Sequence, residues 1–180
     1  MTGPGRMVGV LFVVTAVSAA ALSAVYRATE EPRERIKAAE EERLRREVLP
    51  VAARFKPVRK DGIEFFEGYD KSGSLVGFVA KGRARGYGGE VVVLVGLDRD
   101  LRVTGVRVLE QRETPGLGTK ATEPGFLRQF KGLEIGELKL RRYGGKIDAI
   151  TGATITSRAV TEAAREAAEA VARGLGREGR

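Results

Sequence analysis

The sequence predicts an α+β fold: a compact domain of antiparallel sheet and helices behind a single N-terminal transmembrane helix. Short segments between residues 63 and 109 have a hydrophobic period of two, which is typical of antiparallel strands, and the continuously apolar run at residues 91–95 predicts a strand covered on both faces. Helical spacing of small apolar residues follows later, over residues 157–173. Strands and helices therefore do not alternate along the chain as they do in doubly wound folds.

The first predicted element is a membrane anchor over residues 1–27. Met7–Tyr26 contains no charged side chain, and Arg6 and Arg27 flank it. Twenty helical residues span about 30 Å, the thickness of the hydrocarbon core of a bilayer. A secretory signal peptide is the alternative, because Ala19–Ala21 resembles a cleavage site. The length of the run favours a retained anchor, but the flanking charges do not decide its orientation.

Residues 28–49 predict a charged helical spacer. A helix is expected from Glu30 to Val48, closed by Pro50. Its thin apolar stripe consists of Ile36, Ala39, Leu44 and Val48. The helix either lifts the following domain off the bilayer or packs on that domain.

Two hairpins are expected next. Ile63–Tyr69 pairs with Leu75–Ala80, and Glu90–Leu97 pairs with Leu101–Leu109. The Gly-rich stretch between them, residues 82–89, lacks a dinucleotide fingerprint and a P-loop. It predicts a wide turn that brings the backbone close to another segment.

Two helices complete the predicted domain. A short one covers Thr122–Phe130, with Thr122 as N-cap and Pro124 in its first turn. The last runs from about Ser157 to Arg173, and its Ala- and Val-rich face allows close packing on a sheet.

Composition narrows the chemistry. The chain has no Cys and no His, which excludes thiolate nucleophiles, Cys-type zinc sites and iron–sulfur clusters. No metal site and no acid–base catalytic residue is predicted, so redox chemistry would come from an organic cofactor. The 32 Lys and Arg against 24 Asp and Glu are scattered, and without a nucleic-acid motif they predict no nucleic-acid partner.

Residues 148–154, Asp-Ala-Ile-Thr-Gly-Ala-Thr, are the most informative stretch. They place the hydroxyl of Thr154 where the last helix begins. The first N–H groups of a helix lack intrahelical partners, so they bind phosphate well. A phosphate group could therefore bind at Thr154 or be esterified to it. The alternative is an ordinary turn with a helix N-cap.

Residues 113–120 form a second unusual stretch, in which one Pro and two Gly predict a sharp turn. Leu117 is a lone apolar residue in this loop. It either fills the core or covers a flat ligand, with Thr114 and nearby N–H groups offering hydrogen bonds.

Together these segments resemble the FMN-binding domains found in the G subunit of the Rnf electron-transport complex and in the C subunit of the sodium-pumping NADH:quinone reductase. Residues 148–154 are similar to the flavinylation motif of the family, and Glu-Thr-Pro-Gly-Leu-Gly at 113–118 is similar to the loop that meets the flavin. Gly-Tyr-Gly-Gly at 86–89 is a weaker match. The resemblance implies an FMN-binding domain at residues 50–176, followed by a tail at 177–180.

The resemblance also implies residue roles. FMN would be joined covalently, through its phosphate, to the hydroxyl of Thr154. A separate flavin transferase would make this bond from FAD and would recognise the stretch that contains Asp148. The other cofactor-binding residues implied are Glu113, Thr114, Leu117, Gly118, Lys120, Thr151, Gly152, Ala153, Thr156 and Tyr87.

The function implied is that of an electron-relay subunit in a membrane complex that couples electron transfer to ion translocation. Its partners would be the other membrane and redox subunits and, during maturation, the flavin transferase. The FMN domain would lie outside the cytoplasm, and the isolated chain would not turn over a substrate. A free-standing flavin reductase and a membrane-anchored ligand-binding module without a redox role are the alternatives.

Overall fold

A computed structural model of the chain describes residues 3–177, without side-chain detail at residues 4, 25 and 27–38. Ile36 of the predicted stripe and residues 178–180 of the predicted tail therefore lie outside the described parts. The chain divides into two compact units, Met1–Glu41 and Glu42–Arg180.

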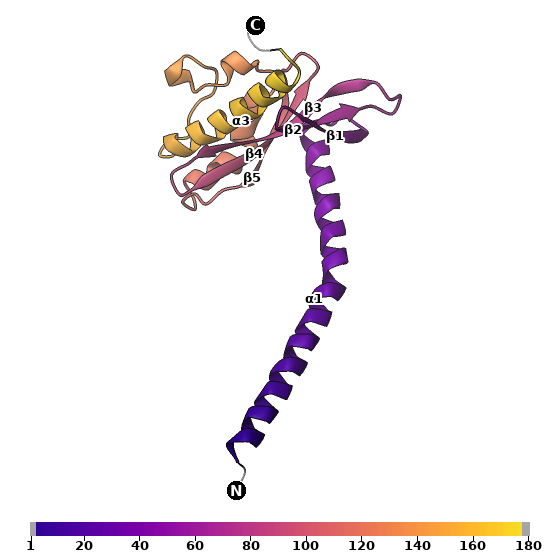
Figure 1. Cartoon of the computed structure of the whole chain (residues 1–180). Coiled ribbons are helices and arrows are strands. Elements are labelled where there is room, and N and C mark those ends of the chain that lie inside the picture. The colour runs from indigo at the N-terminus through magenta and orange to yellow at the C-terminus, as the bar shows by residue number, and fades with distance from the viewer. Residues whose placement is uncertain (1–2, 178–180) are drawn as a thin grey trace. The chain divides into compact units, whose positions relative to one another are not determined.

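The first unit consists of most of helix α1, which runs from Pro4 to Val48 (Figure 1). Within the described residues, Gly5–Ala24 is the one helical stretch that is long and apolar enough to cross a membrane. Its large apolar side chains are exposed, as they would be in a helix that faces lipid. The helix coincides with the predicted anchor.

The second unit is built on an antiparallel sheet with strand order β1-β2-β3-β4-β5 (Figure 1). The strands are β1 (Arg54–Lys60), β2 (Ile63–Tyr69), β3 (Leu75–Arg85), β4 (Glu90–Asp98) and β5 (Val103–Glu110). Both predicted hairpins are confirmed, and β1 is an additional edge strand. Strand β3 continues to Arg85, so the turn that was predicted from residue 82 begins only at Gly86.

Helix α3 (Thr154–Gly174) covers one face of the sheet (Figure 1). Five of its alanines (Ala159, Ala163, Ala164, Ala167 and Ala168) are fully buried, and a Cβ on Gly82 of β3 would overlap the carbonyl oxygen of Ala163. This close contact confirms the small-residue face that the sequence predicts. The helix begins three residues before the predicted Ser157, because the Ser157 N–H already donates to the Ala153 carbonyl (2.9 Å) and closes the first turn.

The opposite face of the sheet holds the end of α1. Val79 and Leu94 point to that face, whereas their neighbours in β3 and β4 point toward α3. Val48 and Leu49 pack on them and are fully buried. The end of the charged helix therefore packs on the domain, which was one of the two alternatives, and the compact unit begins at Glu42.

Short helical turns join β5 to α3. They are η1 (Gly118–Thr122), α2 (Pro124–Leu127), η2 (Arg128–Phe130), η3 (Ile135–Glu137) and η4 (Arg141–Tyr143). The single helix predicted for Thr122–Phe130 is thus divided, and the residue before its first turn is Glu123 rather than Thr122. The Thr122 hydroxyl instead donates to the Thr119 carbonyl (2.8 Å), which ends η1.

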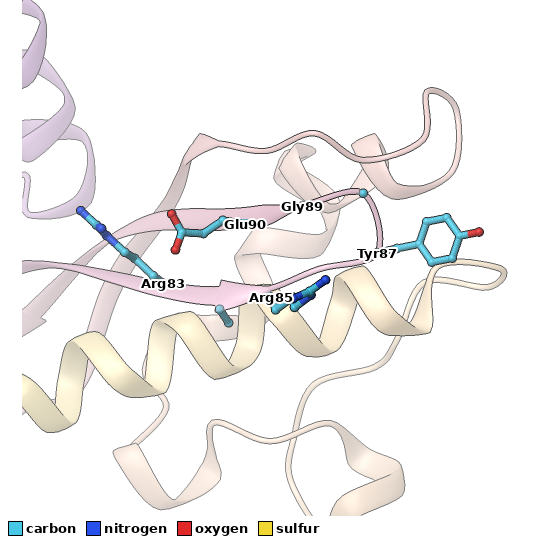
Figure 2. A pocket seen from close by; sticks show the side chains of 7 residues that line it. Arg83, Arg85, Tyr87, Gly89 and Glu90 are labelled. Atoms are coloured by element: carbon cyan, nitrogen blue, oxygen red, sulfur yellow. The ribbon is translucent and has the colours of Figure 1, made fainter.

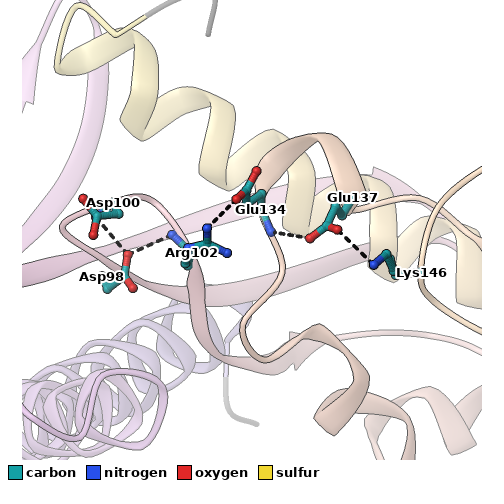
Figure 3. A network of polar contacts seen from close by, with 6 residues as sticks. All are labelled: Asp98, Asp100, Arg102, Glu134, Glu137 and Lys146. Atoms are coloured by element: carbon teal, nitrogen blue, oxygen red, sulfur yellow. Dashed lines mark hydrogen bonds and ion pairs between the residues drawn. The ribbon is translucent and has the colours of Figure 1, made fainter.

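A chain of polar contacts ties this connection to the β4–β5 turn (Figure 3). Arg102 pairs with Glu134 (2.5 Å), and Glu137 accepts from the Glu134 N–H (3.1 Å) and pairs with Lys146 (3.3 Å). The Glu134 N–H and then Lys146 lower the pKa of the Glu137 carboxyl. Exposed pairs of this kind each stabilise by about 0–1 kcal/mol, so they mainly fix the path of the segment.

Candidate functional site

Three loops meet at a cavity of about 590 Å³ at the N-terminal end of α3. This volume is in the usual range for small-molecule sites, roughly 300–1,000 Å³. The lining residues are Tyr87, Glu113, Thr114, Leu117, Gly118, Gly152, Ala153, Thr154, Ile155 and Thr156. The structure therefore brings together nearly all predicted site residues and adds Ile155. Lys120 and Thr151 are exposed and do not line the cavity.

The first wall is the turn between β3 and β4. Gly86 and Gly89 close it with a backbone hydrogen bond (2.7 Å). A Cβ on Gly88 would overlap the carbonyl oxygen of Arg112, so the backbones of two segments touch here as predicted. Tyr87 projects from the turn beyond the ends of the strands and also borders a neighbouring hollow beside Arg83 and Arg85 (Figure 2).

The second wall is the 113–118 loop. The Thr114 carbonyl accepts from the N–H groups of Leu117 (3.3 Å) and Gly118 (3.0 Å), and Gly116 adopts a φ of +77° that favours glycine. Leu117 remains 47% exposed, which excludes the alternative that it fills the core. Its Cδ2 lies 3.5 Å from the position of a Cβ on Gly152, so it borders the 148–154 motif.

The third wall is the start of α3. Thr154 is the first helical residue, and no side chain caps the helix at Ala153. The N–H groups of the first turn therefore have neither intrahelical partners nor a side-chain cap. Within residues 3–177 the Thr154 hydroxyl forms no hydrogen bond, although it is half-buried in the cavity lining. This combination suits an anionic ligand.

The next two hydroxyl groups after Thr154, those of Thr156 and Ser157, form hydrogen bonds within the protein. Thr156 is 3% exposed and donates its hydroxyl hydrogen to Glu113. Ser157 is fully buried, accepts from the Ile150 N–H (2.9 Å) and donates to the Ala153 carbonyl (2.9 Å). Ser157 thus braces the 148–154 turn from inside, and Thr154 is the accessible hydroxyl of the helix start.

Glu113 joins the three walls. One carboxylate oxygen accepts from the Gly88 N–H (3.0 Å) and the other from the Thr156 hydroxyl. Gly86 and Gly118 leave room for it, since a Cβ at either position would meet the Glu113 side chain. The sequence predicts Glu113 as a cofactor contact, but its contacts to the other two walls are not visible in the sequence.

Asp148 is exposed and does not line the cavity. Arg141 donates to both of its carboxylate oxygens (2.7 and 3.1 Å), and these hydrogen bonds hold the pKa of the Asp148 carboxyl below its ordinary value. The Gln129 side chain accepts from the Asp148 N–H (2.8 Å) and donates to its carbonyl (3.3 Å). Asp148 is therefore held in place while its side chain stays accessible.

Comparison with known families places all three walls in one domain type. The model of the FMN-binding domain matches residues 86–169, from the β3–β4 turn to α3. The C subunit of the Na⁺-translocating NADH-quinone reductase of Parabacteroides distasonis has a similar solved structure, with a TM-score of 0.53 and 25% identity. That match covers 63% of this chain and 62% of the other, so the chain spans just under two thirds of its length.

Two relatives extend the similarity beyond this domain. The G subunit of the ion-translocating oxidoreductase complex of Methanosarcina acetivorans is 34% identical, over 92% of this chain and 93% of its own. The G subunit of the Na⁺-translocating ferredoxin:NAD⁺ oxidoreductase complex of Acetobacterium woodii is 36% identical over 84% of both chains. With this identity along most of the sequence, the protein belongs to the family of G subunits of ion-translocating oxidoreductase complexes.

Proposed function

We propose that this chain is a flavoprotein subunit that relays electrons in a membrane complex coupling electron transfer to ion translocation, and that it carries FMN as a phosphoester on Thr154. The observation that carries the proposal is an accessible Thr154 hydroxyl at the uncapped start of a 21-residue helix. It borders a cavity built by all three family-like segments.

The start of α3 fits the phosphate of the cofactor. Free N–H groups and the positive end of the helix dipole favour a phosphodiester there by roughly 0.3–1 kcal/mol. Gly152, with a φ of +80°, and Ala153 add little bulk beside Thr154, so a modifying enzyme could approach. Transfer from FAD would form the bond between the Thr154 oxygen and the FMN phosphorus and release AMP.

The other two walls fit the ring system. Leu117 and Tyr87 are exposed side chains in the lining of the cavity. Leu117 offers an aliphatic surface and Tyr87 an aromatic ring for contact with the flavin. FMN, when bound, supplies the redox chemistry for which the chain has no Cys or His. The protein binds and orients it, while the contacts of Glu113 to Gly88 and Thr156 hold the walls in position.

A covalent tether and a membrane anchor suit a relay subunit. A single bond replaces free-ligand binding with a high effective concentration, which matters where free FMN is scarce. Free FMN would be scarce outside the cytoplasm, so a covalent tether is most useful to a domain that lies there. The Gly5–Ala24 helix would hold the domain at the membrane, where the other members of the complex are its partners. The flavin transferase would recognise the exposed side chain of Asp148.

The proposal is tested by coexpressing the full chain with a flavin transferase. We expect a fluorescent band on a denaturing gel and an intact mass increased by FMN less one water, both absent when the transferase is omitted. If the chain kept its unmodified mass when coexpressed with an active transferase, covalent attachment would be contradicted. Steady NADH oxidation by the isolated, loaded chain would contradict the relay and favour a free-standing reductase.

Leu117→Ala should leave attachment intact but change the absorption spectrum of the bound flavin. The side chain borders Gly152 and is half exposed, so its loss removes an apolar contact to the ring and little core packing. Val51→Ala is the matched control, because Val51 is an exposed apolar residue outside the cavity lining. Spectra that are identical for the wild type and both variants would show that Leu117 does not contact the flavin.

A further inference from the structure

Glu113 has an unusual environment. Among the residues whose side chains the structure describes, it is the one charged residue that is buried, with 6% exposure. The other buried polar residues are the hydroxyl-bearing Thr156, Ser157 and Thr161. Burial of a carboxylate is costly unless nearby groups satisfy it. A buried carboxylate in the lining of the cavity can act on a bound ligand through its charge, in addition to its packing.

The contacts of Glu113 satisfy both of its side-chain oxygens without bringing a positive charge to them. The Gly88 N–H can only donate, and the Thr156 hydroxyl donates to the second oxygen. Each of the two carboxylate oxygens thus accepts one hydrogen bond. Thr156 lies in the first turn of α3, where the helix dipole favours negative charge. In the described part of the chain, no Lys or Arg forms an ion pair with it.

We infer that Glu113 lowers the reduction potential of the flavin proposed to occupy this cavity, by placing an unneutralised negative charge in its wall. The inference rests on the proposed function. Reduction adds negative charge to the flavin, and a nearby carboxylate repels that charge. At an effective dielectric constant of about 20, one charge on the wall of such a cavity changes a one-electron equilibrium by about tenfold or more.

The Glu113→Gln variant separates charge from geometry. The amide keeps both hydrogen bonds, since its oxygen accepts from the Gly88 N–H while its NH₂ group donates to the Thr156 oxygen. In the full chain, loaded by the transferase and held in detergent, we expect a more positive midpoint potential by spectroelectrochemical titration. A tenfold change in the reduction constant corresponds to about 59 mV.

Glu110→Gln is the matched control. Glu110 is an exposed carboxylate at the end of β5, outside the lining of the cavity. The same loss of charge there should shift the potential much less, and the shift should vanish at high salt because exposed charges are screened. The shift in Glu113→Gln should persist at high salt, because a buried charge is screened less.

Glu113→Asp provides a second arm if the glutamine variant does not fold, a point checked by thermal unfolding of each flavin-free chain. Aspartate keeps the charge, so its reduction constant should stay within about twofold of the wild type. The inference would be overturned if folded Glu113→Gln had the midpoint potential of the wild type. It would also be overturned if Glu113→Asp raised the midpoint potential as much as is expected for Glu113→Gln. A wild-type chain that takes up no flavin would instead refute the proposed function.

Discussion

Thr154→Val is expected to eliminate covalent flavin while leaving the domain folded. Valine has the shape of threonine without the hydroxyl, so the chain cannot form the phosphoester. The Thr154 hydroxyl has no hydrogen-bond partner among residues 3–177, so its removal should change the free energy of unfolding by no more than about 0.5 kcal/mol. Coexpression with the transferase, followed by in-gel fluorescence and intact-mass measurement, gives the result.

Thr156→Val is the counterpart, two residues along the same helix. Its hydroxyl is buried and donates to Glu113, so its loss leaves a carboxylate oxygen with one donor fewer. This should cost about 1–3 kcal/mol of stability but keep the attached flavin. The two variants are thus expected to show opposite behaviour. Fluorescence that persists in Thr154→Val and disappears in Thr156→Val would place the bond on Thr156 instead.

The sequence predicts the candidate site well where the signal is local. The 148–154 and 113–118 motifs are contiguous, and each turn follows from its own Gly, Pro and Thr residues. What sequence reasoning missed depends on contacts between segments. Glu113 and Thr156 are 43 positions apart, and only the packing of α3 on the sheet brings them together. Thr151 lies within the first motif and Lys120 two residues beyond the second, but neither lines the cavity, because the fold and not the motif decides which residues face it.

The fold shows the same division. Strands β2 to β5 carry alternating or continuous apolar residues and were predicted, whereas β1 was not. Four of its seven residues are basic and one is Pro57, which fits an edge strand paired on one side but produces no apolar alternation. The apolar stripe of the charged helix could not show which surface it meets. Val48 and Leu49 are buried because glycines on the outer face of the sheet leave space for them.

Gly96→Ala tests the role of these glycines and should strongly destabilise the second unit. A Cβ on Gly96 of β4 would overlap the carbonyl oxygen of Val48 and lie 2.6 Å from the Thr104 hydroxyl oxygen. The Val48 carbonyl belongs to the backbone, so no side-chain rotation can relieve that overlap. The helix end must shift, and its hydrogen bond from Thr104 to the Val48 carbonyl (2.5 Å) would be strained. We expect a loss of about 1–3 kcal/mol, or a Tm lower by about 3–10 °C.

Gly136→Ala is the matched control for this substitution, because a Cβ there would meet no atom within 4 Å. It should leave the Tm of the full chain in detergent unchanged or slightly raised, since alanine reduces the entropy of the unfolded state. Hydrogen exchange locates the effect: Gly96→Ala should speed exchange at the Leu49 amide, which donates to the Arg45 carbonyl (3.0 Å). Equal Tm values and equal exchange in both variants would mean that the end of α1 does not depend on this glycine, and that its apolar contacts to Val79 and Leu94 suffice to hold it on the sheet.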